Sequence, residues 1–461
     1  MLVKHDHLVN KLRSFWRYQL FLPVREGVNT LVRLFFHGPS LHNETERNIW
    51  YLYVEILWAG FLSAAAAFNA TFAVRLGASN TMIGWLSSVP ALLAVVLLVP
   101  SARFLERKSK RTPWIWGSLF LARLGYGLII ILPWLIPAPY RAVSLVGLLI
   151  AISVPSTFFS AGFIPLLADV IPERDRARVL ANRNIIVSAV VAILTLLAGW
   201  WLEAGNQIRW ATFPLNYQIL YLVGFIGSMI SSYCLLKLRV PPSPVIERKP
   251  GPTKGKASLA LFKTLWTENR SFAIMVVDTL VFNLGAWMVA PLYVIFFVNE
   301  LGASDGWIGL NSTLANLGVI IGYMFWQRKV RKWGYRRTLL TTVPFAASYA
   351  FLVSLFPNLT AILAWGVWIS VINPGVDLSH FNLLLEFCPP ERRASYIAIF
   401  STIMNAGAFV GPLIGTALSE VWDIRVLLLI GGGIRLLGAL LFQFSPLQPK
   451  TSPEMFDVLH E

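Results

Sequence analysis

The chain has 461 residues, of which 56% are hydrophobic and only 13% are charged, and its mean hydropathy is +0.62. A soluble protein of this length presents more polar surface to water than such a composition can supply. The composition therefore excludes a soluble globular protein and indicates an integral membrane protein. The net charge of +16 does not indicate nucleic-acid binding, because the basic residues lie in short loops between apolar segments.

The apolar segments, taken in chain order, predict an all-α membrane protein, since one spanning helix needs about 20 apolar residues. Six spans are expected at residues 50–74, 81–103, 113–136, 142–170, 184–204 and 217–237, and six more at 271–298, 306–327, 337–356, 360–388, 395–419 and 423–445. The predicted domains are a basic cytoplasmic or interfacial leader (1–48), a first six-helix half (49–237), a cytoplasmic linker (238–270), a second six-helix half (271–446) and a cytoplasmic tail (447–461). The leader is expected either as a helix at the membrane interface or as a partly ordered basic segment.

A repeat relates the two halves. Residues 76–111 and 301–336 share LGAS and IG in register, at an offset of 301 − 76 = 225 residues, and basic positions of the following loop align at the same offset. A constant offset over a turn, a span and a loop predicts an internal duplication. The expected fold is therefore twelve transmembrane helices in two pseudo-symmetric six-helix bundles.

Charge predicts the orientation of the chain in the membrane. Lysine and arginine gather in the leader, in the central linker and in the loops after spans 2, 4, 8 and 10, whereas the opposite loops hold few, such as Arg75, and include acids such as Asp305. By the positive-inside rule, both termini and the linker are expected in the cytoplasm. An inner or plasma membrane is the predicted location.

The basic loop after span 2 reads PSARFLERKSKR, and its counterpart after span 8 reads QRKVRKWGYRR. Together with twelve spans in two halves, these loops resemble the GxLaDRxGRK signature of the major facilitator superfamily, and the resemblance covers about residues 48–446. Glu106 occupies the acidic position in the first copy, whereas the second copy has Arg331 there. The resemblance implies the fold of that superfamily and a conformational charge lock that is stronger in the first half.

A second repeated pattern follows spans 4 and 10, where Asp169 matches Glu386 and Arg176 matches Arg393. An acid at a helix end that faces a loop of arginines can make charge-assisted contacts in one conformation and break them in another. The alternative is that these charges only fix topology. The predicted gating residues are Arg103, Glu106, Arg107, Arg111, Asp169, Arg176, Arg328, Arg336, Glu386 and Arg393.

Ionisable groups inside predicted spans are costly, so each one is a functional hypothesis. The resemblance implies that spans 1, 4, 7 and 10 line a central cavity, and it therefore places four candidates for proton coupling or solute binding there: Glu55, Asp278, Asp377 and His380. Glu55 either takes up and releases a proton or pairs with an arginine of a neighbouring span.

Span 10 carries its two candidates on one helix face, because Asp377 and His380 are three residues apart. They either relay a proton and bind a polar substrate, or make a structural hydrogen bond. Pro374 and Gly375 are expected to break this span and to free backbone carbonyls for a ligand. In spans 3 and 12, Arg123 and Arg435 either bind an anionic solute or serve as internal or snorkelling charges.

The predicted function is secondary active transport of a small solute by alternating access, coupled to protons or another ion. The alternative is a membrane protein of the same fold that transports nothing and acts as an assembly factor or sensor. The sequence holds no P-loop, no HExxH and no metal-ligand spacing around Cys234 or Cys388, so neither an enzyme, nor a cofactor, nor a metal site is expected. The expected state is a monomer whose partners are the solute, the coupling ion and the lipid bilayer, without nucleic acid.

Overall fold

The computed structural model describes residues 44–108, 110–240, 269–389 and 392–445, and in these ranges helices are the only regular secondary structure. The first half contains α3 (Glu44–Ala66), α4 (Asn69–Arg75), α5 (Asn80–Glu106), α6 (Thr112–Leu135), α7 (Arg141–Val170), α8 (Glu173–Gly205) and α9 (Leu215–Leu236). The second half contains α11 (Arg270–Ile295), α12 (Asp305–Leu355), α13 (Leu359–Phe387), α14 (Arg393–Leu418) and α15 (Ile424–Phe444).

The number of spans follows from the long helix α12. Eleven segments of the described chain are long and apolar enough to cross a membrane, and α3 with α4 make one of them. The 51 residues of α12 hold two of the predicted spans, separated at Gly334, whose φ of 74° and ψ of 169° are not helical. Counting α12 twice gives twelve spans, and the all-α fold of two six-helix bundles is confirmed.

Helix ends differ most from the predicted spans where polar residues extend a helix beyond the apolar segment. Helix α8 begins at Glu173, whereas the fifth span was expected from residue 184, because hydropathy marks the bilayer rather than the helix. The leader up to residue 43 and the tail from residue 446 lie outside the described residues, as does the central linker apart from residues 238–240 and 269–270.

The expected break in span 10 is not present. Helix α13 runs through Pro374 and Gly375 without interruption. A Cβ placed on Gly375 would lie 2.7 Å from the side chains of both Trp326 and Thr342, so this glycine serves close packing against α12. The indole of Trp326 also donates a hydrogen bond to the carbonyl of Val371 at 2.9 Å.

The duplication is visible in the backbone of the two LGAS turns. Gly77 and Gly302 both have positive φ, 87° and 64°. Ser79 accepts a hydrogen bond from the backbone N–H of Met82, and Ser304 accepts one from Trp307, so both following helices start with the same N-cap. Each residue of the second turn lies 225 positions after its counterpart in the first.

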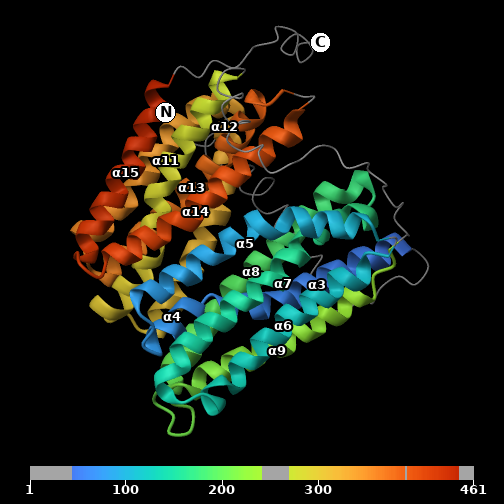
Figure 1. Ribbon diagram of the computed structural model, residues 1–461, viewed down its shortest axis with the longest axis vertical. Coiled ribbons are helices and arrows are strands. Elements are labelled where there is room, and N and C mark those ends of the chain that lie inside the picture. The colour runs from blue at the N-terminus through green and yellow to red at the C-terminus, as the bar shows by residue number, and fades with distance from the viewer. Residues whose placement is uncertain (1–43, 109, 241–268, 390–391, 446–461) are drawn as a thin grey trace, which may run out of the picture.

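The two bundles meet at one end and are separate at the other. We call the end with Gly77 and Gly302 the turn end, and the end with Leu236 and Arg270 the linker end. One apolar cluster, which includes Phe72 and Leu292, combines residues of both halves. Two further clusters toward the linker end belong to one half each. Figure 1 shows the same arrangement, with the bundles meeting near α4 and diverging toward the linker end.

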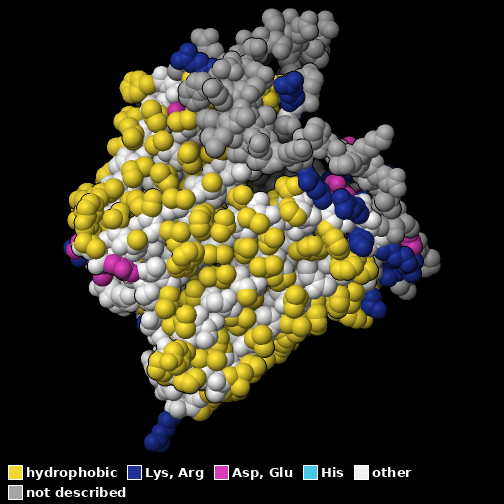
Figure 2. All heavy atoms as spheres, viewed as in Figure 1, with side chains coloured by type: hydrophobic (Ala, Val, Ile, Leu, Met, Phe, Trp, Pro, Cys, Tyr) yellow, Lys and Arg dark blue, Asp and Glu magenta, His cyan; other side chains and the backbone are white. Residues whose placement is uncertain are grey.

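The outer surface suits a lipid environment. Large apolar side chains on the outside of the helices are exposed, among them Leu128, Leu197 and Ile226. Figure 2 shows a mostly hydrophobic face over α5, α6 and α9, with Lys and Arg side chains gathered where α5 ends. An apolar band with charges at its edge is typical of a protein that spans a bilayer, so the chain is an integral membrane protein.

Candidate functional site

The turn end is held together by a buried carboxylate that neither half could satisfy alone. Asp305 begins α12 and is only 3% exposed. Its Oδ1 accepts hydrogen bonds from Nε of Arg75 at 2.9 Å and from the hydroxyl of Tyr217 at 2.8 Å, both from the first half. Arg75 also donates to the carbonyl of Ala303 at 2.9 Å. We call Arg75, Tyr217 and Asp305 the turn-end clasp.

Two glycines bring the halves into contact beside this clasp. A Cβ on Gly199 of α8 would lie 2.9 Å from the Cα of Gly309 in α12, so the two backbones touch where neither residue has a side chain. Deeper in the bundle, the hydroxyl of Thr313 donates to the carbonyl of Ala192 at 2.9 Å. The contact between α8 and α12 therefore closes the turn end well into the membrane.

Arg75 and Asp305 are expected from the sequence only as loop charges, and the sequence does not predict the clasp. The two residues are 230 positions apart, and nothing in either segment indicates the other. The signal that could have found Asp305 is its place in the repeat, where the first half has Asn80. An acid at the start of a helix is also stabilised by the helix dipole. That ordinary explanation accounts for Asp305 without predicting its contact with the other half.

The ten predicted gating residues lie toward the linker end, at or just beyond the ends of α5, α7 and α13, at the starts of α6, α8 and α14, or on either side of Gly334 in α12. Asp169 ends α7 and Glu386 ends α13, and both side chains are exposed. Arg176 donates to the carbonyl of Ala168 at 3.1 Å within its own half. The charge lock predicted for these residues stays a prediction.

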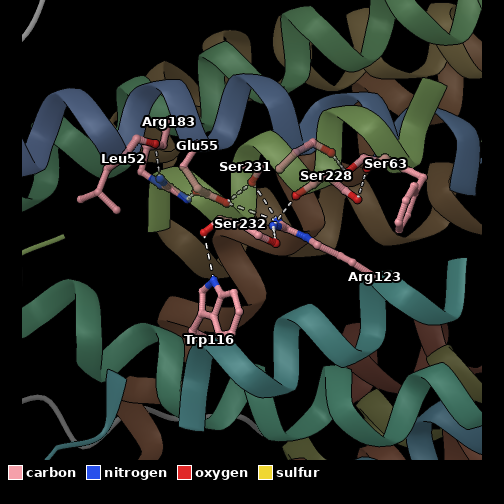
Figure 3. A network of polar contacts seen from close by, with 11 residues as sticks. Leu52, Glu55, Ser63, Trp116, Arg123, Arg183, Ser228, Ser231 and Ser232 are labelled. Atoms are coloured by element: carbon pink, nitrogen blue, oxygen red, sulfur yellow. Dashed lines mark hydrogen bonds and ion pairs between the residues drawn. The ribbon is translucent and has the colours of Figure 1, made fainter. Parts of the chain in front are cut away.

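Glu55 lies inside the first bundle, in a network of polar contacts (Figure 3). Its Oε2 pairs with Arg183 of α8 at 2.9 Å, and its Oε1 accepts from Ser231 of α9 at 3.0 Å and lies 3.7 Å from Arg123 of α6. The exposed fraction is 4% for Glu55 and Arg123 and 5% for Arg183. We call Glu55, Arg123 and Arg183 the amino-terminal ion network.

Both arginines of this network make further hydrogen bonds. Arg123 donates to the carbonyl of Ser228 at 2.7 Å and to the hydroxyls of Ser231 and Ser232. Arg183 donates to the carbonyl of Leu52. The network thus joins α3, α6, α8 and α9 within one half, which is the geometry of the ion-pair alternative. The proton-coupling role of Glu55 stays a prediction.

The predicted spans place Arg183 in the loop just before span 5, and the structure corrects this position. Arg183 is the eleventh residue of α8, and it is almost completely buried. The signal was the run from Glu173 onward, which continues the helix of the apolar span without a Gly or Pro.

Asp278 and His380 both contact neighbouring helices of the second half. Asp278 is 3% exposed and accepts a hydrogen bond from Ser445 at 2.7 Å, beyond the end of α15. His380 Nε2 lies 2.7 Å from the hydroxyl of Thr279 in α11. That hydroxyl has one proton and donates to the carbonyl of Met275 at 2.6 Å, so the histidine nitrogen acts as the donor.

Asp377 is the candidate with an exposed side chain at membrane depth. It is nine residues after Trp368, about 2.5 helical turns, so the two side chains project from opposite faces of α13. Trp368 packs at 5.7 Å against Phe345 on an exposed apolar face, which places Asp377 on the inner face. Tyr323 of α12 and Arg435 of α15 lie within electrostatic range of Asp377.

In the described part of the chain, no group of three or more His, Cys, Asp or Glu side chains is placed to hold a metal ion. Cys234 and Cys388 are free and buried in different halves.

Among curated proteins, a 188-residue segment is 25% identical to the Na(+), Li(+), K(+)/H(+) antiporter of Planococcus maritimus, covering 38% of this chain and 42% of the relative. A 177-residue segment is 28% identical to multidrug resistance protein MdtH of Aeromonas hydrophila, covering 36% of this chain and 42% of the relative. The matches thus span less than half the length of these relatives.

The fold is similar to that of solved transporters. The D-xylose–proton symporter matches with a TM-score of 0.67 at 12% identity, over 88% of this chain and 99% of that chain. An inward-facing, unoccupied bacterial homologue of the human lysosomal transporter Spinster matches with a TM-score of 0.59 at 14% identity, over 88% and 98%. The family model described as Major Facilitator Superfamily matches residues 52–284 and 275–457. The chain belongs to the Major Facilitator Superfamily.

Proposed function

We propose that this protein is a secondary active transporter that moves a small solute by alternating access and couples this movement to protons. It would lie in the inner or plasma membrane with both termini, and so its linker end, in the cytoplasm. The membership of a transporter superfamily and the antiporter and symporter names of its relatives support transport. The charge distribution at the linker end supports the orientation.

The observation that carries the proposal is the contact between the halves at the turn end alone. The clasp and the glycine contact close one side, while the apolar clusters toward the linker end are separate. Two bodies that meet at one end, through an apolar cluster and polar contacts, can rock so that the opposite end closes instead. The acids Asp169 and Glu386 and the arginines of the basic loops lie at the linker end, where closure would change their contacts.

Asp377 is the residue that we propose for proton coupling. Glu55 and Asp278 are buried in contacts within their own halves, whereas Asp377 is exposed on the inner face of α13. A carboxyl that must exchange a proton with both sides in turn needs access to the space between the halves. His380, one helical turn away on the same face, is its proposed partner.

The test uses the purified full-length protein in liposomes that contain a pH-sensitive dye. Members of a metabolite and drug library are added singly, and solute-dependent proton movement is recorded. We expect at least one solute to move protons, Asp377→Asn to abolish that movement, and Asp175→Asn, which changes an acid in the first turn of α8 at the linker end, to retain it. Absence of any solute movement, together with stoichiometric co-purification of another membrane protein, would reject transport and favour the assembly role.

A further inference from the structure

Arginines at membrane depth have different bonding partners in the two halves. Arg123 and Arg183 share the carboxylate of Glu55 and donate to serine and backbone oxygens. Arg435, in the middle of α15, makes no hydrogen bond or ion pair with any described residue, and its Nε is buried without an acceptor. The second half therefore contains a cation whose acceptor is missing in this conformation.

The position of Arg435 is fixed by close packing of α15 against α11. A Cβ on Gly285 of α11 would lie 3.0 Å from the Cβ of Arg435, so this glycine lets α15 approach until the backbones touch. The guanidinium then lies 4.6 Å from the ring centre of Phe282. A cation over an aromatic face gains some stabilisation, but the ring offers no hydrogen-bond acceptor.

The polar groups near Arg435 belong to the inner part of the bundle. Asp377 and Tyr293 are within electrostatic range, but neither is within hydrogen-bond or ion-pair distance. The ring of Phe442 lies 6.2 Å from Phe282 and 6.2 Å from His380. Arg435, the buried rings of Phe282 and Phe442, and His380 thus lie close together in the interior of the second half, on the helices that pack around Asp377.

A guanidinium at membrane depth whose Nε is buried without an acceptor, and which has no carboxylate within ion-pair distance, is unfavourable, and apolar residues of similar volume are usually as stable or more stable there. From this contrast we infer that Arg435 binds a carboxylate of the transported solute, an assignment that rests on the transport proposed above. The planar fork of arginine matches a carboxylate in two parallel hydrogen bonds. Asp377 and His380 are placed to receive a hydroxyl or ammonium group of the same solute.

A pair of variants tests the premise without a ligand. Arg435→Met should leave the melting temperature of the full-length protein unchanged or raise it, because an unpaired charge is removed. Arg123→Met should lower it clearly, because Glu55 loses one of its two cations. If Arg435→Met lowers the melting temperature as much as Arg123→Met does, Arg435 has a structural counter-charge and the inference is wrong.

The ligand test measures stabilisation of the wild-type protein by a panel of aliphatic and aromatic monocarboxylates and amino acids, each compared with its neutral amide. Inorganic phosphate is included to separate general anion binding from carboxylate binding. We expect at least one carboxylate to stabilise the protein while its amide does not, and Arg435→Met and Arg435→Lys to weaken that binding roughly 10- to 150-fold.

Each other outcome has a defined meaning. Equal effects of acids and amides, equal binding by Arg435→Met, or stabilisation by phosphate alone would overturn the inference. If Arg435→Met instead carries a neutral or cationic solute as fast as the wild type, transport stands and the carboxylate site does not. If carboxylates bind through Arg435 but cross no membrane, the site stands and the proposed transport fails.

Discussion

Replacing Glu55 by Gln should destabilise the first bundle strongly. The glutamine keeps the size of the side chain and one acceptor oxygen, but it removes the charge shared by Arg183 at 2.9 Å and Arg123 at 3.7 Å. Both arginines would then lie almost completely buried without a counter-charge. Removing one partner of a buried ion pair costs about 3–5 kcal/mol, and that loss corresponds to a melting temperature roughly 6–20 °C lower for a unit of this size.

The same helix offers a matched control. Glu44, also in α3, forms an ion pair with Arg239 at 2.6 Å. Its side chain is 69% exposed and that of Arg239 is 60% exposed. Exposed pairs contribute about 0–1 kcal/mol, so Glu44→Gln should shift the melting temperature by only a few degrees. The measurement is thermal unfolding of both purified variants in the same detergent, with the proton movement assay run on the same preparations.

The two hypotheses for Glu55 give opposite results in these assays. A structural network predicts that Glu55→Gln melts well below both the wild type and Glu44→Gln. An unchanged melting temperature with loss of proton movement would refute this reasoning and restore Glu55 as the proton site. The double variant Glu55→Gln/Arg183→Gln should lose less stability than the two single changes added together, because the second change removes one of the uncompensated charges.

Three further predictions concern the turn end and the backbone. Asp305→Asn should weaken the clasp with Arg75 and Tyr217, so that the turn end opens more often. The measurement is the rate at which maleimide labels a cysteine placed at Thr313, in a protein without Cys234 and Cys388, and we expect faster labelling. Unchanged labelling would argue against a gate there. Gly309→Leu should abolish solute movement by forcing α8 and α12 apart, whereas Gly433→Leu, with open space around its Cβ, should have no effect. Gly334→Ala should cost about 1–3 kcal/mol, measured as a lower melting temperature, because its backbone conformation is one that only glycine adopts readily.

The fold could be predicted because its signals are local and repeated. Runs of about 20 apolar residues marked the spans, and the LGAS repeat at positions 76 and 301 marked the duplication. The candidate site was less accessible to sequence, because it depends on which helices pack together. Arg183 has the spacing of a loop charge but lies inside α8, and α13 is unbroken at Pro374, where Gly375 packs against Trp326. Asp305 and Arg75 meet only because the turn ends of the two halves close on each other.

Charged side chains at membrane depth are arranged differently in the two halves of this duplicated chain. That difference supports different roles for the two bundles in transport. In the first half, Glu55 holds two arginines in the packed interior and makes four helices move together. In the second half, Asp278 is engaged at the linker end, Asp377 is exposed, and Arg435 has no acceptor within the described residues. A polar group left unsatisfied in one conformation gains most from a ligand that arrives there. The second bundle is therefore where we expect the solute and the proton to be recognised, while the first bundle acts as the rigid body against which it moves.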